Sequence, residues 1–479
     1  MAKTVGIVGA GVSGLATAMR LAYHNLDVEV HEKLSRPGGR NNIIEDKGFK
    51  FDTGPSFVLM PDFFNELFSY CGLDIKDYLD LRALDVHYKI FFSDRKTLTV
   101  YHDTKLTCEQ LERIEPGSSR RFNDFINATG DIYKAVKPLL YRCFSAKDIL
   151  SIRYMWLPFK LHIFKSYWDI ASKYFKSEKL RYAFTFEAMF MGVSCFDAPA
   201  FYSIISYADH MQKVFHPMGG MYKIPQALES ICRKFGVKFY YDHPAEKISH
   251  GHSGLTIRFK EKEVSYDAVV SSADYSYTQR HLLGRKLPQY KYSCSVFLIY
   301  LGLKKKISHL AHHNLFFSSD IKRNLHEIFQ TVQAPFDPSF YVHVPTVTDQ
   351  SLAPMDKEIL YILIPTANLE HTEDSLRGHR ERLRKITLDK ISHVCGQNVE
   401  DLIEIEHHFY PADFIGRYNI EYGATFGLAH NLMQSAFFRP VNYDSRIKNL
   451  FYVGASTQPG GGLPPVIASS RIAAGLILR

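Results

Sequence analysis

Residues 4–32 read TVGIVGAGVSGLATAMRLAYHNLDVEVHE. A short β-branched run leads into three glycines, Gly9, Gly11 and Gly14, and helical character follows them. A second β-branched run then ends at Glu32, eighteen residues past Gly14. The order of strand, glycine turn, helix, strand and acid predicts a βαβ unit that binds a dinucleotide. We expect strands over 4–8 and 28–31 and a helix over 15–24.

Each residue type in this unit has a physical role. Gly9 permits a tight turn, Gly11 lets the backbone approach a pyrophosphate, and Gly14 lets the helix and strand pack closely. The N-terminus of the helix stabilises phosphate charge. Glu32 can accept hydrogen bonds from a ribose, and its charge would repel a ribose phosphate, which argues against NADP. A glycine-rich turn without a ligand is the alternative interpretation, which the complete βαβ context disfavours.

Two further motifs follow closely. Pro37–Arg40 reads PGGR, and Phe51–Pro55 reads FDTGP. Together with the glycine turn they resemble the GR2-type flavoproteins, the superfamily of amine oxidases and phytoene desaturases. The resemblance implies FAD as the cofactor, with the backbone of Gly38 and Gly39 and the side chain of Arg40 facing it. It extends the implied site to three neighbouring residues, Lys33, Gly54 and Pro55.

The C-terminal end carries a second part of the flavin site. An apolar strand is expected over 450–453 and a helix over about 466–478, with a glycine run between them. The N-terminus of that helix can stabilise negative charge on a reduced flavin ring. The residues implied at the ring are Gly454, Ala455, Gly461, Gly462 and Leu463. Because the site uses both ends of the chain, the FAD domain must be discontinuous.

A third part lies in the middle of the chain. Gly219–Met221 precedes an expected helix over 224–235 and a strand over 237–241. Further strands are expected over 255–259 and 263–270. In the family, the turn after the first of these strands passes the adenine, and the resemblance places Ala245 there.

We therefore expect an α/β fold with a discontinuous GR2-type FAD-binding, Rossmann-like domain, an inserted α+β substrate domain and a helical membrane-facing segment. The FAD-binding domain is expected to comprise residues 1–84, 216–289 and 406–479. The substrate domain is expected to comprise 85–215, which looks mainly helical, and 290–405, which has strand patterns over 293–303 and 358–365.

Composition limits the classes of partner. A net charge of +8 over 479 residues is mild and is no nucleic-acid signature. The seven cysteines are odd in number and show no CxxC or Cys/His spacing, which predicts reduced thiols and no metal site. No apolar stretch of about 20 residues occurs, so no transmembrane helix is expected.

The segment 151–181 combines aromatic and basic side chains. It contains both tryptophans, Trp156 and Trp168, and seven basic residues against two acids, a local charge of +5. This composition is typical of an interfacial helix at a bilayer surface. A buried helix with a solvated basic edge is the alternative. We expect the segment to contact membrane lipid, which predicts a cytoplasmic protein that associates peripherally with the inner face of the cell membrane.

Longer motifs extend the resemblance over almost the whole chain. Among them are FDTGPSFVLMPDFFNELFSYCGLDIKDYLDL, HPMGGMYKIPQAL, HNLFFSSDIKRNL, YVHVPTVTDQSLAP and GASTQPGGGLPPVI. They resemble the bacterial-type carotenoid desaturases, and most of all the dehydrosqualene desaturases. A departure lies at 458–462, QPGGG, where the family usually has His-Pro-Gly-Ala-Gly.

The resemblance implies an FAD-dependent oxidoreductase acting on CH-CH bonds, which introduces double bonds into a linear C30 precursor, dehydrosqualene. Hydride abstraction leaves an allylic cation, and loss of a neighbouring proton forms the double bond. The implied partners are the isoprenoid polyene, a membrane surface, and oxygen or a quinone as electron acceptor. No catalytic residue is assigned, because the candidate proton acceptors Asp209 and His210 favour a structural interpretation.

Three other functions stay open. A carotenoid terminal oxygenase or isomerase has a similar sequence. The escort proteins of prenylated GTPases share the fold and bind lipid without flavin, but the intact glycine turn, Glu32 and Gly38–Arg40 disfavour such a flavin-free module. An amine oxidase or protoporphyrinogen oxidase is disfavoured because the similarity extends into the substrate domain.

Overall fold

The computed structural model of this chain describes residues 3–145, 148, 156–251, 254–372, 374 and 376–479. A parallel sheet with the strand order β19-β13-β1-β2-β9 forms the centre of one half of the molecule. Its strands are β1 (Thr4–Val8), β2 (Asp27–His31), β9 (Lys238–Tyr240), β13 (Ala268–Ser271) and β19 (Leu450–Tyr452). The start, the middle and the end of the chain thus meet in one sheet, which confirms the expected discontinuity.

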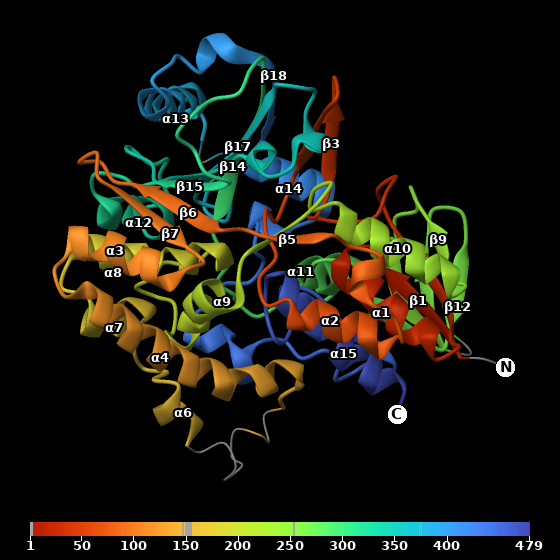
Figure 1. Ribbon diagram of the computed structural model, residues 1–479. Coiled ribbons are helices and arrows are strands. Elements are labelled where there is room, and N and C mark those ends of the chain that lie inside the picture. Colours follow the sequence, from red (N-terminus) through yellow and green to blue (C-terminus); the bar gives the residue numbers. More distant parts are fainter. Residues whose placement is uncertain (1–2, 146–147, 149–155, 252–253, 373, 375) are drawn as a thin grey trace.

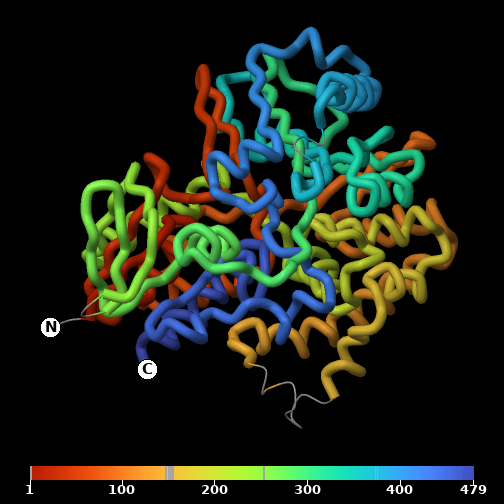
Figure 2. Tube along the Cα trace, turned by 180° about the vertical axis from the view of Figure 1, so that it is seen from behind, coloured from red at the N-terminus to blue at the C-terminus, as the bar shows by residue number. Residues whose placement is uncertain are grey.

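Helices from the same three regions share the apolar core of this sheet. They are α1 (Val12–Tyr23), α2 (Asp62–Tyr70), α10 (Lys223–Lys234) and α15 (Leu463–Ile477). α1 contacts both α10 and α15, so the red N-terminal helix and the blue C-terminal helix lie side by side (Figure 1), and Figure 2 shows the two chain ends close together. This position explains why α1 is buried continuously from Val12 to Ala22.

Three smaller sheets occur in the described part of the chain besides the two large ones. β10 (Lys247–Gly251), β11 (Gly254–Arg258) and β12 (Glu263–Tyr266) form an antiparallel meander that shares an apolar cluster with β13 and β19. The hairpin of β3 (Ile43–Asp46) and β4 (Phe49–Asp52) packs instead on the second half of the molecule. β5 (Leu81–Ala83) and β8 (Phe215–Pro217) pair where the chain crosses between the halves.

The second half contains a sheet with the order β18-β14-β17-β16-β15-β6-β7. Its strands are β6 (Val86–Phe91), β7 (Thr97–Tyr101), β14 (Ser295–Leu303), β15 (His313–Phe316), β16 (Phe340–His343), β17 (Glu358–Thr366) and β18 (Ile403–Phe409). β14 is buried along its whole length because a separate apolar cluster packs on each of its faces. β18 pairs with β14 and spans residue 406, so this sheet extends past the expected domain boundary.

Helices cover one face of this sheet. They are α3 (Thr104–Ile114), α4 (Ser118–Val136), α7 (Tyr167–Tyr174), α8 (Glu178–Ala183), α9 (Ile204–Gln212) and α12 (Ile321–Phe329). The insert 85–215 is mainly helical, as expected, but it also supplies β6 and β7. Sequence analysis missed these strands because β6 finds its parallel partner, β15, more than two hundred residues away.

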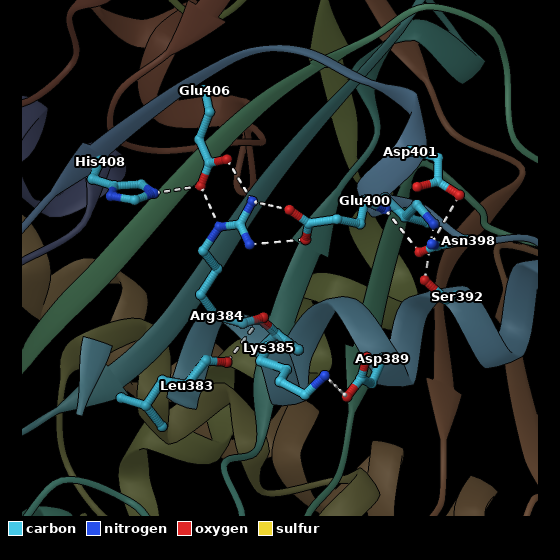
Figure 3. A network of polar contacts seen from close by, with 12 residues as sticks. Leu383, Arg384, Lys385, Asp389, Ser392, Asn398, Glu400, Asp401, Glu406 and His408 are labelled. Carbon is cyan, nitrogen blue, oxygen red and sulfur yellow. Dashed lines mark hydrogen bonds and ion pairs between the residues drawn. The ribbon is translucent and has the colours of Figure 1, made fainter. Parts of the chain in front are cut away.

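The helix α13 (Arg380–Cys395) is attached to the edge of this sheet by an ion network (Figure 3). Arg384 donates to both carboxylate oxygens of Glu406 on β18, at 2.6 and 2.7 Å, and to those of Glu400, at 2.8 and 2.9 Å. Burial raises the pKa of Glu406, but hydrogen bonds from Arg384 and His408 outweigh burial and lower it to about 2. The network therefore stabilises the attachment of α13.

The segment 151–181 is not one interfacial helix. Residues 151–155 lie outside the described part of the chain, and the remainder forms α6 (Leu157–Lys160), α7 and the start of α8. Tyr167 and Phe175 are buried in the helical core, whereas Phe159 and Phe164 are exposed. The alternative of a buried helix thus holds for the second half of the segment, and the first half keeps exposed aromatic rings.

Most expected elements agree with the structure to within a few residues. The C-terminal helix begins at Leu463, three residues earlier than expected, because Pro464 and Pro465 occupy its first turn. Among the described helices, none is both long and apolar enough to cross a membrane.

Candidate functional site

One large cavity, about 540 Å³ in volume, lies between the two halves of the molecule. One end is lined by the glycine motifs of the dinucleotide unit, and the other by apolar side chains of the second sheet and its helices. The expected site residues that line it are Gly9, Gly11, Glu32, Lys33, Gly38, Gly39, Arg40, Gly54, Pro55, Ala245, Gly454, Ala455, Gly461, Gly462 and Leu463. Motifs from the start, middle and end of the chain therefore meet at one place.

Gly14 is the expected residue that does not line the cavity. A Cβ atom at Gly14 would lie 2.2 Å from the carbonyl oxygen of Gly9, so only glycine allows α1 to pack this closely on the turn. A Cβ atom at Gly11 would meet nothing closer than the Ser272 hydroxyl, at 3.7 Å. The turn is thus closed behind by Gly14 and open toward the cavity at Gly11, where a pyrophosphate would reach the N-terminus of α1.

Glu32 is 5% exposed at the end of β2 and is held by the backbone around it. Its Oε2 accepts from the Ala10 amide at 2.7 Å, and its Oε1 accepts from the Leu34 amide at 2.9 Å. Burial raises the pKa of the carboxyl, and the two amides oppose that effect. Glu32 is therefore oriented by the turn and also presents an acceptor to the cavity.

The Lys33 side chain is bonded within the protein. Its Nζ donates to the carbonyl of Gly416, at 2.9 Å, and to Oδ1 of Asn419, at 2.8 Å, at the end of α14 (Pro411–Tyr418). These contacts connect the dinucleotide unit to a segment close to 400 residues further along the chain. Because Lys33 and Asn419 both line the cavity, their contact forms part of its wall.

The PGGR loop lies directly on the glycine turn. Gly38 has φ +116° and donates its amide to the carbonyl of Ala10 at 2.9 Å. Arg40 donates to the carbonyl of Thr425 at 2.6 Å. Burial lowers the pKa of Arg40, and the charge of Asp274 opposes that effect, so two buried groups of opposite charge flank the cavity. Asp274 is a cavity-lining residue that the sequence motifs did not indicate.

The C-terminal loop is fixed by side chains that the motifs did not indicate. Buried Arg439 donates to the carbonyl oxygens of Thr457, at 3.2 Å, and Gln434, at 3.0 Å. Gln458, at the departure from the family pattern, exchanges hydrogen bonds with the backbone of Phe144, at 2.7 and 3.1 Å. The amide side chain therefore anchors the loop to the substrate half.

The far end of the cavity is apolar. Its walls come from the loop after β4, from the residues between α8 and α9, from the sheet and from α12. They include Leu59, Met60, Phe186, Phe190, Ile205, Leu315, Phe317, Leu325, Ile328 and Leu363. An aliphatic and aromatic lining of this kind excludes water and accommodates a hydrocarbon, but it cannot orient a polar substrate.

A buried histidine cluster lies beside the cavity. His312 Nε2 is 3.0 Å from His343 Nε2, and His312 Nδ1 is 2.7 Å from the Thr348 hydroxyl. His216 Nε2 lies 3.5 Å from Asp349 Oδ2. The contact between His216 and Asp349 connects β8 to the loop after β16. The expectation that the protein has no metal site stays a prediction.

The residues present fit a flavin dinucleotide. The turn open at Gly11 and the N-terminus of α1 suit a pyrophosphate, and the buried acceptor Glu32 suits a ribose. The loop from Gly454 starts beside Ser13 on α1 and leads to the N-terminus of α15, which lines the cavity and can face an isoalloxazine ring. Ser56, Tyr341, His430 and Arg439 complete the site and escaped sequence analysis, because no motif spacing marks them.

Comparisons with known proteins agree with this geometry. The family model described as "Flavin containing amine oxidoreductase" matches residues 12–478. The chain is 38% identical to the "zeta-carotene-forming phytoene desaturase" of Myxococcus xanthus, over 98% of this chain and 93% of that protein. It is 32% identical to the "4,4'-diapophytoene desaturase (4,4'-diaponeurosporene-forming)" of Staphylococcus aureus strain Newman, over 98% of this chain and 97% of the relative.

Solved structures show the same fold at low identity. Putrescine oxidase bound to putrescine superposes with a TM-score of 0.67 at 15% identity, and the match covers 100% of both chains. Cyclohexylamine oxidase from Brevibacterium oxydans has a TM-score of 0.62 at 16% identity, again over 100% of both chains. The similarity to the desaturases is the more informative one, because it extends through both halves of the chain at higher identity.

Proposed function

Since the chain belongs to the family of flavin containing amine oxidoreductases and is an FAD-dependent carotenoid desaturase, we propose that it introduces double bonds into a linear C30 precursor, dehydrosqualene. The observation that supports this proposal is the large cavity, which joins the dinucleotide motifs to an apolar chamber. A linear polyene offers no polar group, so its position depends on the shape of that chamber. The sequence similarity to C30 desaturases supports a substrate of thirty carbon atoms.

In this reaction the protein positions the substrate and excludes water from it. When bound, FAD supplies the two-electron oxidant that accepts a hydride from the substrate. The apolar walls exclude water, which would otherwise capture the allylic cation that hydride loss leaves on the hydrocarbon. The N-terminus of α15 lies at the cavity, where the helix dipole stabilises added negative charge, although Pro464 and Pro465 in its first turn carry no amide hydrogen.

A C40 precursor is a second candidate, because the 38% identity is to a protein named for phytoene. The test uses purified protein, FAD and lipid vesicles loaded with either dehydrosqualene or phytoene. We expect products lighter by pairs of hydrogen atoms, with absorption shifted to longer wavelength, and a higher kcat/KM for dehydrosqualene. A higher kcat/KM for phytoene would overturn the C30 assignment. Products heavier by oxygen would indicate an oxygenase, and products of unchanged mass an isomerase.

The exposed aromatic side chains between residues 156 and 164 support membrane contact. Trp156, Phe159 and Phe164 are 50%, 80% and 85% exposed. Leu157 and Leu161, between them, are buried in an apolar cluster with cavity-lining residues. α6 therefore turns one face to the cavity wall and the other to solvent, with Lys160 and Lys165 exposed beside its aromatic rings.

This arrangement supports a peripheral position on a lipid surface, with the cavity supplied from the bilayer. A hydrocarbon substrate partitions into lipid, so collection from a membrane is physically favoured over collection from water. We extend the proposal to the inner face of the cell membrane, where a quinone, alternatively oxygen, would accept the electrons. Flotation of the protein with vesicles, and reoxidation assays with each acceptor, test these two points separately.

A further inference from the structure

A chain of hydrogen bonds leads out of the large cavity. Ser56 and Tyr341 both line the cavity, and the Tyr341 hydroxyl donates to Ser56 Oγ at 2.7 Å. On its other side, the Tyr341 hydroxyl lies 2.6 Å from Nδ1 of His313. Ser56 directly follows Pro55, which places the start of this chain beside the expected flavin site. His313 does not line the large cavity and is 3% exposed, so the chain runs from the cavity into the protein.

Beyond His313 lies a second, small cavity of about 20 Å³. Its polar lining residues are His87, Tyr88, Asp209, His313 and Tyr341. His313 Nε2 is buried and has no hydrogen-bond partner among the residues that the structure describes. A cavity of roughly 10–15 Å³ or more with two to four polar partners suits one water molecule. The volume of this cavity therefore suits a single water, and His313 Nε2, the Tyr88 hydroxyl and Asp209 Oδ1 are the polar groups that would bind it.

A close contact between a histidine and a carboxylate lies on the far side of the small cavity. His87 Nδ1 is 3.1 Å from Asp209 Oδ1, and both side chains are almost completely buried. The ring of His87 lies 5.7 Å from the ring of His102, between centroids, and His102 is only partly buried. A path of ionisable groups thus continues from the small cavity toward the surface.

We propose that Ser56, Tyr341, His313 and one water in the small cavity carry the proton released during desaturation from the substrate cavity to Asp209. The proposal rests on carotenoid desaturation and holds for either substrate length. Because the apolar chamber excludes water, the released proton requires another acceptor, which this hydrogen-bond chain provides.

The proposed step balances as follows in atoms and electrons. One C–H bond of the substrate has already lost its hydrogen and electron pair as hydride to FAD. The neighbouring C–H bond then breaks, its electron pair forms the second bond of the new double bond, and its proton goes to Ser56 Oγ.

In the structure Tyr341 donates to Ser56, so both hydroxyl groups first rotate until Ser56 donates to Tyr341 and Tyr341 donates to Nδ1 of His313, with the ring proton on Nε2. Each hydroxyl then gives its own proton onward as it receives one, His313 gains a proton on Nδ1 and loses the one on Nε2 to the water, and the water gives one proton to Asp209. The net result is one proton on Asp209, and rotation of the hydroxyl groups with return of the ring proton to Nε2 resets the hydrogen-bond chain.

The charge states of the buried groups suit this path. Burial lowers the pKa of His313 well below its usual value, so the ring is neutral, with one donor and one acceptor nitrogen. Burial, followed by the charge of Asp209, raises the pKa of Glu187 to about 8. Glu187 therefore carries a proton at pH 7 and is not the proton acceptor.

His313 and Asp209 do not line the substrate cavity, so they act through the other groups of the hydrogen-bond chain. They are therefore positioning residues. His313→Gln keeps a polar side chain but cannot pass a proton between two ring nitrogens, and Asp209→Asn removes the final acceptor. Tyr300→Phe is a matched control, since Tyr300 lies on the same sheet, donates to the Thr53 carbonyl at 3.4 Å and is outside the chain.

The measurements are kcat in H₂O and D₂O, KM, FAD content and a crystal structure. For His313→Gln and Asp209→Asn we expect kcat to fall about 10- to 100-fold, at or below the low end of typical contributions from positioned proton transfer. KM and FAD content should stay within twofold of wild type. The kcat of the wild type and of Tyr300→Phe should decrease equally in D₂O, because the relayed protons exchange with solvent, and electron density should show one water near His313 Nε2.

A wild-type kcat in both variants would overturn the proposal, as would a small cavity without density for water. If Asp209→Asn fails to fold, His313→Gln and Ser56→Ala decide the question. Failure of the wild type to desaturate any polyene would instead overturn the proposed function, so the two failures are distinguishable.

Discussion

The amide of Gly461 donates a hydrogen bond to Nε2 of buried His430 at 3.0 Å. Because Nε2 accepts, the ring proton resides on Nδ1, which lies 3.2 Å from the carbonyl of Met191 and donates to it. Burial lowers the pKa of His430 well below its usual value, which is consistent with this neutral tautomer. One imidazole thus connects the glycine loop at the flavin end of the cavity to the substrate half.

Enlarging Gly461 should disrupt this connection. A Cβ atom there would lie 3.1 Å from Cε1 of His430, so a leucine must displace the ring or the loop. We expect Gly461→Leu to lose turnover by at least about 100-fold, the scale set by angstrom-level misplacement of reacting groups. Its melting temperature should change little. Gly475→Leu is the control, because a Cβ atom at this exposed position of α15 meets nothing within 4 Å. Wild-type turnover in Gly461→Leu would contradict this role for the loop.

Changing Glu32 should weaken retention of FAD. Glu32→Arg removes the acceptors of the Ala10 and Leu34 amides and places a cation in the turn. A hydrogen bond to a charged group contributes about 1.5–3 kcal/mol, so FAD affinity should fall about tenfold or more. Flavin fluorescence released on dilution measures the loss. Glu29→Gln, on the same strand but outside the cavity, should retain FAD like the wild type. Full flavin occupancy in Glu32→Arg would exclude the ribose role.

Removing the exposed aromatic rings should weaken vesicle binding. Burying a phenylalanine contributes about 1.5–3 kcal/mol, so the double variant Phe159→Ser, Phe164→Ser should bind vesicles at least about tenfold more weakly. Reversing the charge of Lys160, Lys165, Lys173 and Lys176 to Glu should weaken binding to anionic vesicles further at low salt. Phe336→Ser is the matched control, since Phe336 is 64% exposed elsewhere on the molecule. Unchanged sedimentation with vesicles in both test variants would leave α6 as an ordinary surface helix.

The network around Glu406 should make stability depend on acid pH. The pKa of Glu406 falls from an ordinary value of 4.5 to about 2 in the folded state, a difference on the order of 3 kcal/mol at neutral pH. A lowered carboxyl pKa stabilises the fold fully above about pH 5, and this contribution is lost as the pH falls from 4.5 toward 2. The stability difference between wild type and Glu406→Gln, from thermal unfolding, should therefore shrink on acidification. A difference that is constant from pH 7 to pH 3 would show that Arg384 does not favour the charged carboxylate.

Local patterns explain what was predictable. The glycine turn, Glu32 and the PGGR motif each meet a requirement at a single backbone position. Their identity and spacing can therefore be recognised from the sequence before the fold is known. Gly14 illustrates this, because the steric reason for glycine lies only five residues away, at Gly9. The long segment 151–181 was harder, because composition averages over side chains that face opposite ways. Its rings divide between core and surface only when α6 and α7 are placed.

The sequence by itself determined the dinucleotide unit, the discontinuous domain and the family resemblance, because these depend on residues that are close together or in family order. Only the tertiary structure decided which side chains complete the cavity. Ser56 meets Tyr341 across 285 residues of sequence, and Gly461 meets His430 through a loop contact rather than a motif. The physical reason is that such pairs depend on strand register and helix docking, which arise from burial of apolar surface across the whole chain and leave no periodic signal in either partner alone.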